Sequence, residues 1–96
     1  MVSFNDIRAR RDEVLALAAK HGAHNVRVFG SVARGENTPA SDIDFLVAMD
    51  DDRSLLDHIA MIRELEEMLG CQVDVVIDEA LDRSIRDTVM AEVKQL

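Results

Sequence analysis

The chain has 96 residues, of which 48 % are hydrophobic and 31 % are charged, and its formal net charge is -8. This length supports one small hydrophobic core, so we expect a single domain over residues 1–96 without a second, substrate-recognising domain. The acidic surface repels phosphate backbones, which disfavours direct binding of DNA or RNA. Its three aromatic residues are all Phe, so few side chains are available to stack on a nucleobase.

Cysteine content and hydropathy indicate a cytoplasmic protein. Cys71 is the single cysteine, so it cannot form an internal disulfide or, by itself, a zinc site. No apolar run is long enough to cross a membrane, and no signal peptide is evident. We therefore expect a reducing environment and no membrane contact.

The first half of the chain predicts one helix followed by two strands. Ser3 and Asp6 resemble a capping box, and apolar residues at helical spacing predict a helix over 4–21. Residues 25–29 and 42–49 predict two strands, which are separated by a short helical turn and a loop.

The second half of the chain predicts helix, strand and helix. Ser54 marks the start of a helix whose apolar face continues to Gly70. Residues 71–77 predict the third strand, and Asp78 is a candidate cap for a last helix over 79–95. The order αβ(α)βαβα predicts an α+β fold with a small mixed three-stranded sheet flanked by helices.

Three aspartates fall on the second and third predicted strands. Side chains alternate between the faces of a strand, so Asp42 and Asp44 point to the same side. The same alternation places Asp74 on the opposite face of its strand from its two valine neighbours. Asp74 therefore lies near Asp42 and Asp44 if the two strands are adjacent. Such a cluster is costly to desolvate unless cations neutralise it, and carboxylate oxygens suit Mg²⁺ or Mn²⁺. Two metal ions held there would bridge the phosphates of a nucleotide.

A Gly-Ser pair follows the first predicted strand. Gly30 allows the backbone to approach a triphosphate without an intervening Cβ, and Ser31 offers a hydroxyl and an N–H at a helix start. Arg34 is a further candidate for phosphate contact, although a pairing with Glu36 or Asp42 explains it equally well. Asp-x-Asp alone is uninformative in so acidic a chain, whereas Gly-Ser at a fixed offset before it is expected by chance in about three cases in a thousand.

The complete pattern resembles the signature of the DNA polymerase β-type nucleotidyltransferase superfamily. It consists of Gly30-Ser31, ten intervening residues, Asp42-x-Asp44 and Asp74 on a later strand. The string GSVARGENTPASDIDFLV in a short chain resembles the minimal nucleotidyltransferases, the antitoxins of HEPN/MNT toxin-antitoxin pairs. The resemblance spans nearly the whole chain and implies a palm fold like that of polymerase β.

The resemblance also implies an activity and a partner. Members of this family use Mg²⁺ and ATP to transfer AMP onto a tyrosine hydroxyl of the partner HEPN ribonuclease, which silences it. Carried onto this chain, it implies that Asp42 and Asp44 hold the two metal ions. Asp74 would share one ion and help to deprotonate the acceptor, while Gly30 and Ser31 would hold the triphosphate. The expected substrate is ATP and the expected partner is a cognate HEPN toxin.

Two other functions stay open. A non-catalytic antitoxin would neutralise its toxin by occlusion, since an acidic surface can cover a basic RNA-binding cleft. A nucleotidyltransferase acting on a small molecule such as an aminoglycoside is a more distant resemblance, because those enzymes generally have an added domain for the drug.

The remaining polar and sulfur-containing residues are interpreted as structural. The acidic run 50–52 predicts a solvated loop, and Cys71 a small buried hydrophobic residue. The histidines lack metal-ligand spacing, so we expect surface or helix-end positions for His21, His24 and His58. Met61 and Met68 lie on the apolar helix face and are expected to pack.

Overall fold

A mixed sheet of four strands forms the centre of the fold in the computed structural model, which describes residues 1–96. The strands are β1 (Ala23–Phe29), β2 (Ile43–Met49), β3 (Val73–Ile77) and β4 (Lys94–Gln95). Their order across the sheet is β3-β2-β1-β4, in which β1 is antiparallel to β2 and β4 whereas β2 and β3 are parallel. The predicted α+β class is therefore confirmed.

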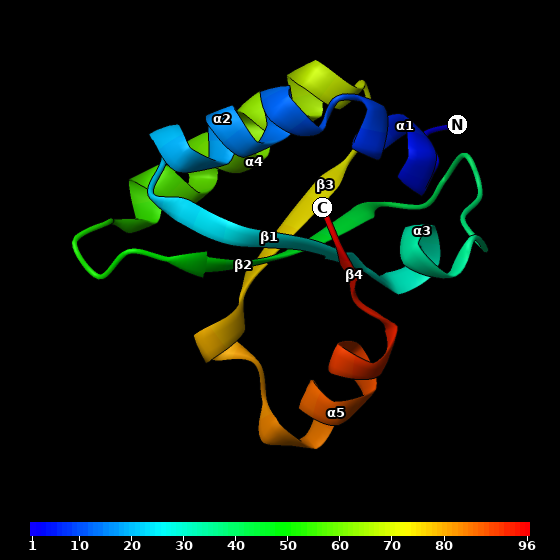
Figure 1. Cartoon of the computed structure of the whole chain (residues 1–96). Coiled ribbons are helices and arrows are strands. Elements are labelled where there is room, and N and C mark those ends of the chain that lie inside the picture. Colours follow the sequence, from blue (N-terminus) through cyan, green and yellow to red (C-terminus); the bar gives the residue numbers. More distant parts are fainter.

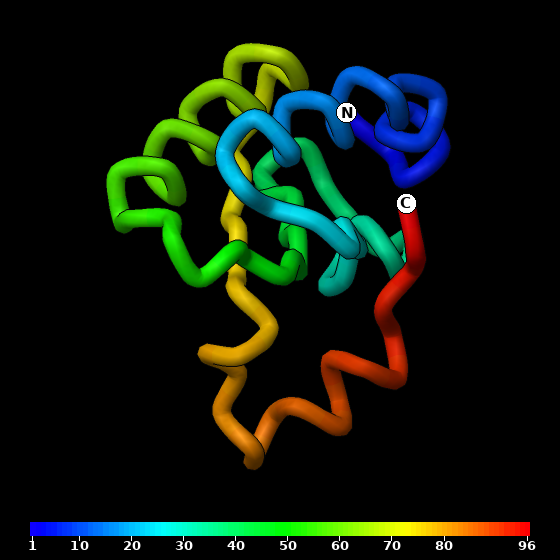
Figure 2. Tube along the Cα trace, turned by 60° about the vertical axis from the view of Figure 1, so that its left-hand side comes forward, coloured from blue at the N-terminus to red at the C-terminus, as the bar shows by residue number.

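Helices lie on both sides of this sheet. They are α1 (Phe4–Ala9), α2 (Arg11–Lys20), α3 (Gly30–Arg34), α4 (Leu55–Leu69) and α5 (Arg83–Glu92), together with a 3₁₀ turn, η1 (Asp78–Ala80). α2 and α4 pack together on one face of the sheet, whereas η1 and α5 lie on the opposite side (Figure 1 and Figure 2). None of the helices has the length and apolar character that crossing a membrane requires.

The main apolar core lies between the sheet and the layer of α1, α2 and α4. Along β2, the side chains of Ile43, Phe45 and Val47 are all buried in this core. Leu46 is also buried but lies outside that cluster. Because side chains alternate along a strand, Asp44 shares the face of Leu46, which is the side of η1 and α5.

The predicted number of strands is wrong by one. Residues 94 and 95 were expected to be helical, but the backbone becomes extended at Val93. The chain then pairs with β1, with Arg27 opposite Gln95 and Val28 opposite Lys94. This short fourth strand depends on a partner far away in the sequence, which helical periodicity does not report. Burial of Leu96 at the chain end stabilises the pairing.

Two predicted helices have different boundaries in the structure. The helix expected over 4–21 is interrupted at Arg10, whose guanidinium pairs with Glu13 and donates to the carbonyl of Met68 at the end of α4. The last helix begins at Arg83 rather than near residue 79, because the Asp82 side chain caps it by accepting from the Ser84 N–H at 3.0 Å. Tertiary contact and a better cap therefore override the expected boundaries.

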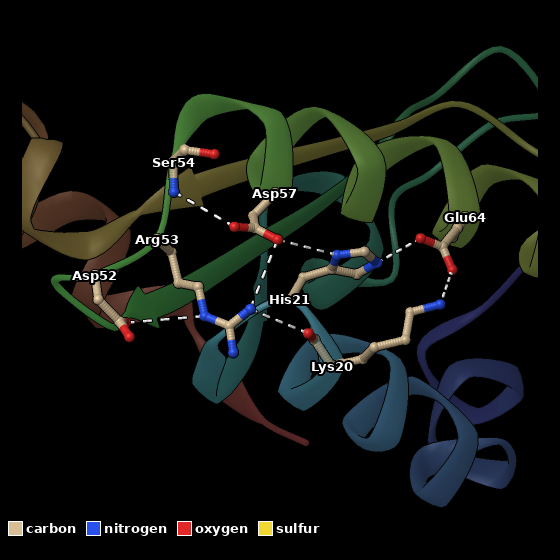
Figure 3. A network of polar contacts seen from close by, with 7 residues as sticks. All are labelled: Lys20, His21, Asp52, Arg53, Ser54, Asp57 and Glu64. Carbon is tan, nitrogen blue, oxygen red and sulfur yellow. Dashed lines mark hydrogen bonds and ion pairs between the residues drawn. The ribbon is translucent and has the colours of Figure 1, made fainter.

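His21 lies at the end of α2, as the expected surface or helix-end position allows, but it is buried rather than exposed. Its ring is only 10 % exposed and lies between α2 and α4, where Nε2 contacts the Glu64 carboxylate and Nδ1 is 3.6 Å from Asp57 Oδ1 (Figure 3). Lys20 contacts Glu64 as well, and this hydrogen bond is the main cause that lowers the pKa of Glu64. Arg53 completes the network through Asp57. The network joins the two helices by polar contacts.

The structure agrees more closely with the expectations for the other histidines, the methionines and the cysteine. His24 is exposed as expected, whereas His58 is half-buried and its Nε2 donates to the Val75 carbonyl at 2.7 Å. Met61 is fully buried, and Met68 packs against the core. Cys71 also packs against the core, and burial raises the pKa of its thiol, which does not favour a nucleophile.

Candidate active site

The strand register brings two of the predicted aspartates together. In the parallel pairing of β2 with β3, Asp44 lies directly opposite Asp74. Asp42 immediately precedes β2, whose pairing with the β3 segment begins at the next residue, where the Ile43 N–H donates to the Gln72 carbonyl at 3.0 Å. The juxtaposition expected if the strands were neighbours is therefore present.

These carboxylates lie on the face of the sheet that looks away from the main core. Val73 and Val75 are buried in the core beside β2, which leaves Asp74 on the opposite face. Asp42 and Asp74 are exposed, whereas Asp44 is half-buried. A ligand or a second protein can therefore reach two of the three carboxylates directly.

Asp44 carries the strongest electrostatic perturbation in this cluster. Burial is the main cause that raises its pKa, and the negative charges of Asp74 and Asp42 add to it. Glu92 contributes in the same direction and Arg34 opposes it, so that the pKa of Asp44 rises from 3.8 to about 6. A carboxylate crowded by like charges is stabilised by a nearby cation.

The backbone at Gly30 lies against the Asp44 carboxylate. A Cβ placed on Gly30 would lie 2.2 Å from Asp44 Oδ2, so the Asp44 carboxylate would have to turn away to make room for it. The residue also has a φ of 73°, in the left-handed region that favours glycine. The conformation thus favours glycine here, and any larger residue would displace the Asp44 carboxylate. The Gly-Ser turn and the aspartates consequently belong to one site, with Ser31 next in α3.

A residue that the sequence analysis did not single out completes the site. Glu92, at the end of α5, accepts a hydrogen bond from the Gly30 N–H at 3.0 Å through Oε1. Its Oε2 accepts from Arg34 Nη1 at 2.9 Å, while Arg34 Nε donates to Glu36 at 3.0 Å. Of the two pairings considered for Arg34, the one with Glu36 is present. No local motif marks Glu92, because it lies 62 residues after Gly30.

The oxygen ligands of the three aspartates are of the kind that hard divalent cations prefer. All three aspartates offer oxygen ligands, and the raised pKa of Asp44 shows that their negative charges are close enough to interact. No three His, Cys, Asp or Glu side chains converge at metal-binding geometry in this structure, so the neighbouring carboxylates do not point at one common position. They would have to turn toward a shared ion, which the exposed positions of Asp42 and Asp74 permit.

Comparison with known proteins identifies the family of the chain. Residues 12–95 match the model of the nucleotidyltransferase domain family. A candidate protein adenylyltransferase of Methanocaldococcus jannaschii is 35 % identical over 91 residues, which cover 95 % of each chain. The protein adenylyltransferase MntA of Thermococcus cleftensis is 40 % identical over 77 residues, which cover 80 % of this chain and 78 % of MntA.

Solved structures share the fold. A candidate minimal nucleotidyltransferase is 47 % identical, with a TM-score of 0.87 over 99 % of this chain and 97 % of its own. The complex of a tri-AMPylated HEPN toxin of Shewanella oneidensis with its MNT antitoxin matches at a TM-score of 0.69 over 92 % of this chain and 69 % of the other, at 19 % identity. That second likeness concerns the fold alone. The chain therefore belongs to the nucleotidyltransferase domain family, among the minimal nucleotidyltransferases, and is related to the protein adenylyltransferase MntA.

Proposed function

We propose that this chain is a metal-dependent protein adenylyltransferase that acts as an antitoxin. It would transfer AMP from ATP to a tyrosine hydroxyl of a cognate HEPN toxin. The observation that carries the proposal is the placement of Asp44 beside both Asp74 and the Gly30 backbone, since nucleotidyl transfer needs carboxylates and a phosphate-binding turn in one place.

Each residue of the site has a proposed role. Asp42 and Asp44 would hold Mg²⁺, with Asp74 sharing one ion. When bound, Mg²⁺ supplies positive charge that offsets the carboxylates and the charge that develops on the phosphates. Gly30 and Ser31 would orient the triphosphate through N–H and hydroxyl donors.

The exposed carboxylate of Asp74 is suited to an acceptor that comes from another protein. It would accept the proton of the tyrosine hydroxyl as that oxygen bonds to the α-phosphorus and pyrophosphate leaves. Asp44, being half-buried, is less accessible to a second protein. This difference supports assigning the acceptor side of the site to Asp74.

Support for a toxin as the acceptor comes from the relatives. Two of them bear the name of protein adenylyltransferases, and a protein of the same fold was solved with an AMPylated HEPN toxin. The net charge of -8 also favours a protein over a nucleic acid as the substrate.

Intact-mass spectrometry tests the proposal. The cognate HEPN protein is incubated with this chain, ATP and Mg²⁺, beside an Asp42→Asn/Asp44→Asn variant. We expect mass increments of AMP with the wild type only, and fragmentation then maps the acceptor to a tyrosine. Transfer that persists in the double variant would contradict the assigned carboxylates.

Occlusion is the second candidate, favoured by the acidic surface alone. It predicts a stable stoichiometric complex that silences the toxin equally well with the wild type and with the double variant. Modification instead predicts a toxin that stays silent after the two proteins are separated. The absence of any mass increment together with equal silencing would establish occlusion.

A further inference from the structure

Glu92 reaches the active site because of the way the chain returns to the sheet. β4 runs antiparallel to β1, with Val28 opposite Lys94. If the same register is followed two residues further, Glu92 comes opposite Gly30. The end of α5 is thus held beside the Gly-Ser turn by backbone pairing that does not involve the Glu92 side chain.

The Glu92 carboxylate binds the Gly30 N–H, which the proposed function assigns to the triphosphate, and Arg34, the further candidate for phosphate contact. One oxygen accepts from the Gly30 N–H at 3.0 Å and the other from Arg34 Nη1 at 2.9 Å. Its side chain is 21 % exposed, against 44 % for Arg34, so the contact is partly shielded from solvent. A carboxylate with two bound oxygens presents the same negative charge and acceptor chemistry to these donors as a phosphate group does.

We propose that Glu92 is an internal competitor for the phosphate site, so that the triphosphate of a nucleotide binds this chain by displacing the Glu92 carboxylate from Gly30 and Arg34. The inference rests on the proposed function, because it takes the Gly-Ser turn to be the phosphate site. It adds a residue that opposes binding rather than one that promotes it.

Two physical arguments support displacement over joint occupancy. The Gly30 amide has one hydrogen, so a phosphate oxygen and Glu92 Oε1 compete for it. A carboxylate left at this distance would also repel a polyphosphate, since like charges a few ångströms apart disfavour each other in a partly shielded site. The contact therefore weakens the binding of any ligand whose phosphate takes the Gly30 amide hydrogen.

Little else would have to move when the carboxylate leaves. Val89 is the only buried residue of α5, and the rest of that helix lies mostly at the surface. Rotation of the Glu92 side chain, or a small shift of the end of α5, would suffice to vacate the donors. The backbone pairing of β4 can persist through either change.

Titration calorimetry of Mg-ATP into the full chain tests this inference. Glu92→Gln removes the charge with little change in shape, and Glu92→Ala removes the contact altogether. We expect the Kd for ATP to fall about tenfold in Glu92→Gln, as the loss of a charge-assisted contact implies, and at least as far in Glu92→Ala.

Asp87→Asn is the matched control, because Asp87 is an exposed acidic residue of the same helix and its variant loses the same charge. It should bind ATP as the wild type does, which separates local competition from a change in net charge. Circular dichroism shows whether each variant is folded.

The opposite result would identify Glu92 as an anchor of α5 rather than a competitor. Unchanged or weaker ATP binding in both folded Glu92 variants, while the wild type still binds ATP and transfers AMP, overturns this inference and leaves the proposed function intact. If neither the wild type nor any variant binds ATP or transfers AMP, the proposed function fails and the inference fails with it.

Discussion

Replacing Asp44 with Asn should make the metal-free protein more stable at neutral pH. Asp44 is half-buried, and its carboxylate is crowded by those of Asp74 and Asp42. Asn has nearly the same shape but no charge, so the substitution removes the repulsion while the packing is kept. The negative charge of Asp44 thus lowers the stability of the metal-free protein, as is common for residues that serve function rather than folding.

The size of the effect follows from the raised pKa. A pKa of about 6 instead of 3.8 corresponds to about 3 kcal/mol, at about 1.4 kcal/mol for each pKa unit. Solvent screens part of this interaction at a half-buried carboxylate, so we expect a gain of about 1–2 kcal/mol in the free energy of unfolding.

The sign of the pH dependence follows by linkage. Between pH 4 and pH 6, about the range between the unfolded and folded pKa values, the folded protein binds the Asp44 proton more tightly than the unfolded chain does. The contribution of Asp44 to stability therefore falls as the pH rises through this range. The advantage of Asp44→Asn should be full at pH 7.5 and should vanish near pH 4.

Urea unfolding in the presence of EDTA measures this difference, with the wild type and Asp44→Asn compared at several pH values. Asp51→Asn is the control for net charge, because Asp51 is an exposed loop residue; its unfolding free energy should match that of the wild type. A wild type as stable as Asp44→Asn at pH 7.5 without metal would refute the reasoning, as would a difference that does not shrink at low pH.

Two further predictions concern the backbone at Gly30 and the ion pair between Arg27 and Asp78. Gly30→Ala should lower the unfolding free energy by about 1–2 kcal/mol through left-handed strain and should abolish AMP transfer, because its Cβ meets Asp44 Oδ2 at 2.2 Å. Gly35→Ala has similar strain, at a φ of 71°, but open space around its Cβ, so it should lose similar stability in urea unfolding while transfer persists. Arg27→Met should cost about 3 kcal/mol, since Arg27 is 5 % exposed and pairs with Asp78 at 2.9 Å. Adding Asp78→Leu should recover most of that loss, and a double variant as unstable as Arg27→Met would show that the pair itself is not the cause.

Much of the site could be predicted because its signals are local. Alternation along a strand placed Asp42 and Asp44 on one face without knowledge of any partner strand. The Gly30-Ser31 turn and its offset from the aspartates are likewise properties of one continuous segment. The start of the first helix at Ser3 was predictable for the same reason, because a capping box lies within four residues.

The residues that sequence reasoning missed depend on segments far apart in the chain. Glu92 lies in an ordinary amphipathic stretch, and only the pairing of β4 with β1 brings it to Gly30. His21 lies at a helix end as expected, but its burial depends on α4, which packs over it and supplies Glu64 and Asp57. Neither position carries a motif that would distinguish it from a surface residue.

The family, the α+β class and the likeness to a nucleotide-binding turn followed by paired carboxylates could be predicted from the sequence, because these features depend on short-range spacing and alternation. Three features became evident only in the tertiary structure. Asp74 lies opposite Asp44, β4 adds a fourth strand beside β1, and the Glu92 carboxylate accepts a hydrogen bond from the Gly30 N–H. The physical reason is that strand pairing and helix packing select among distant partners by the free energy of the whole fold, whereas a local pattern constrains only the residues within it.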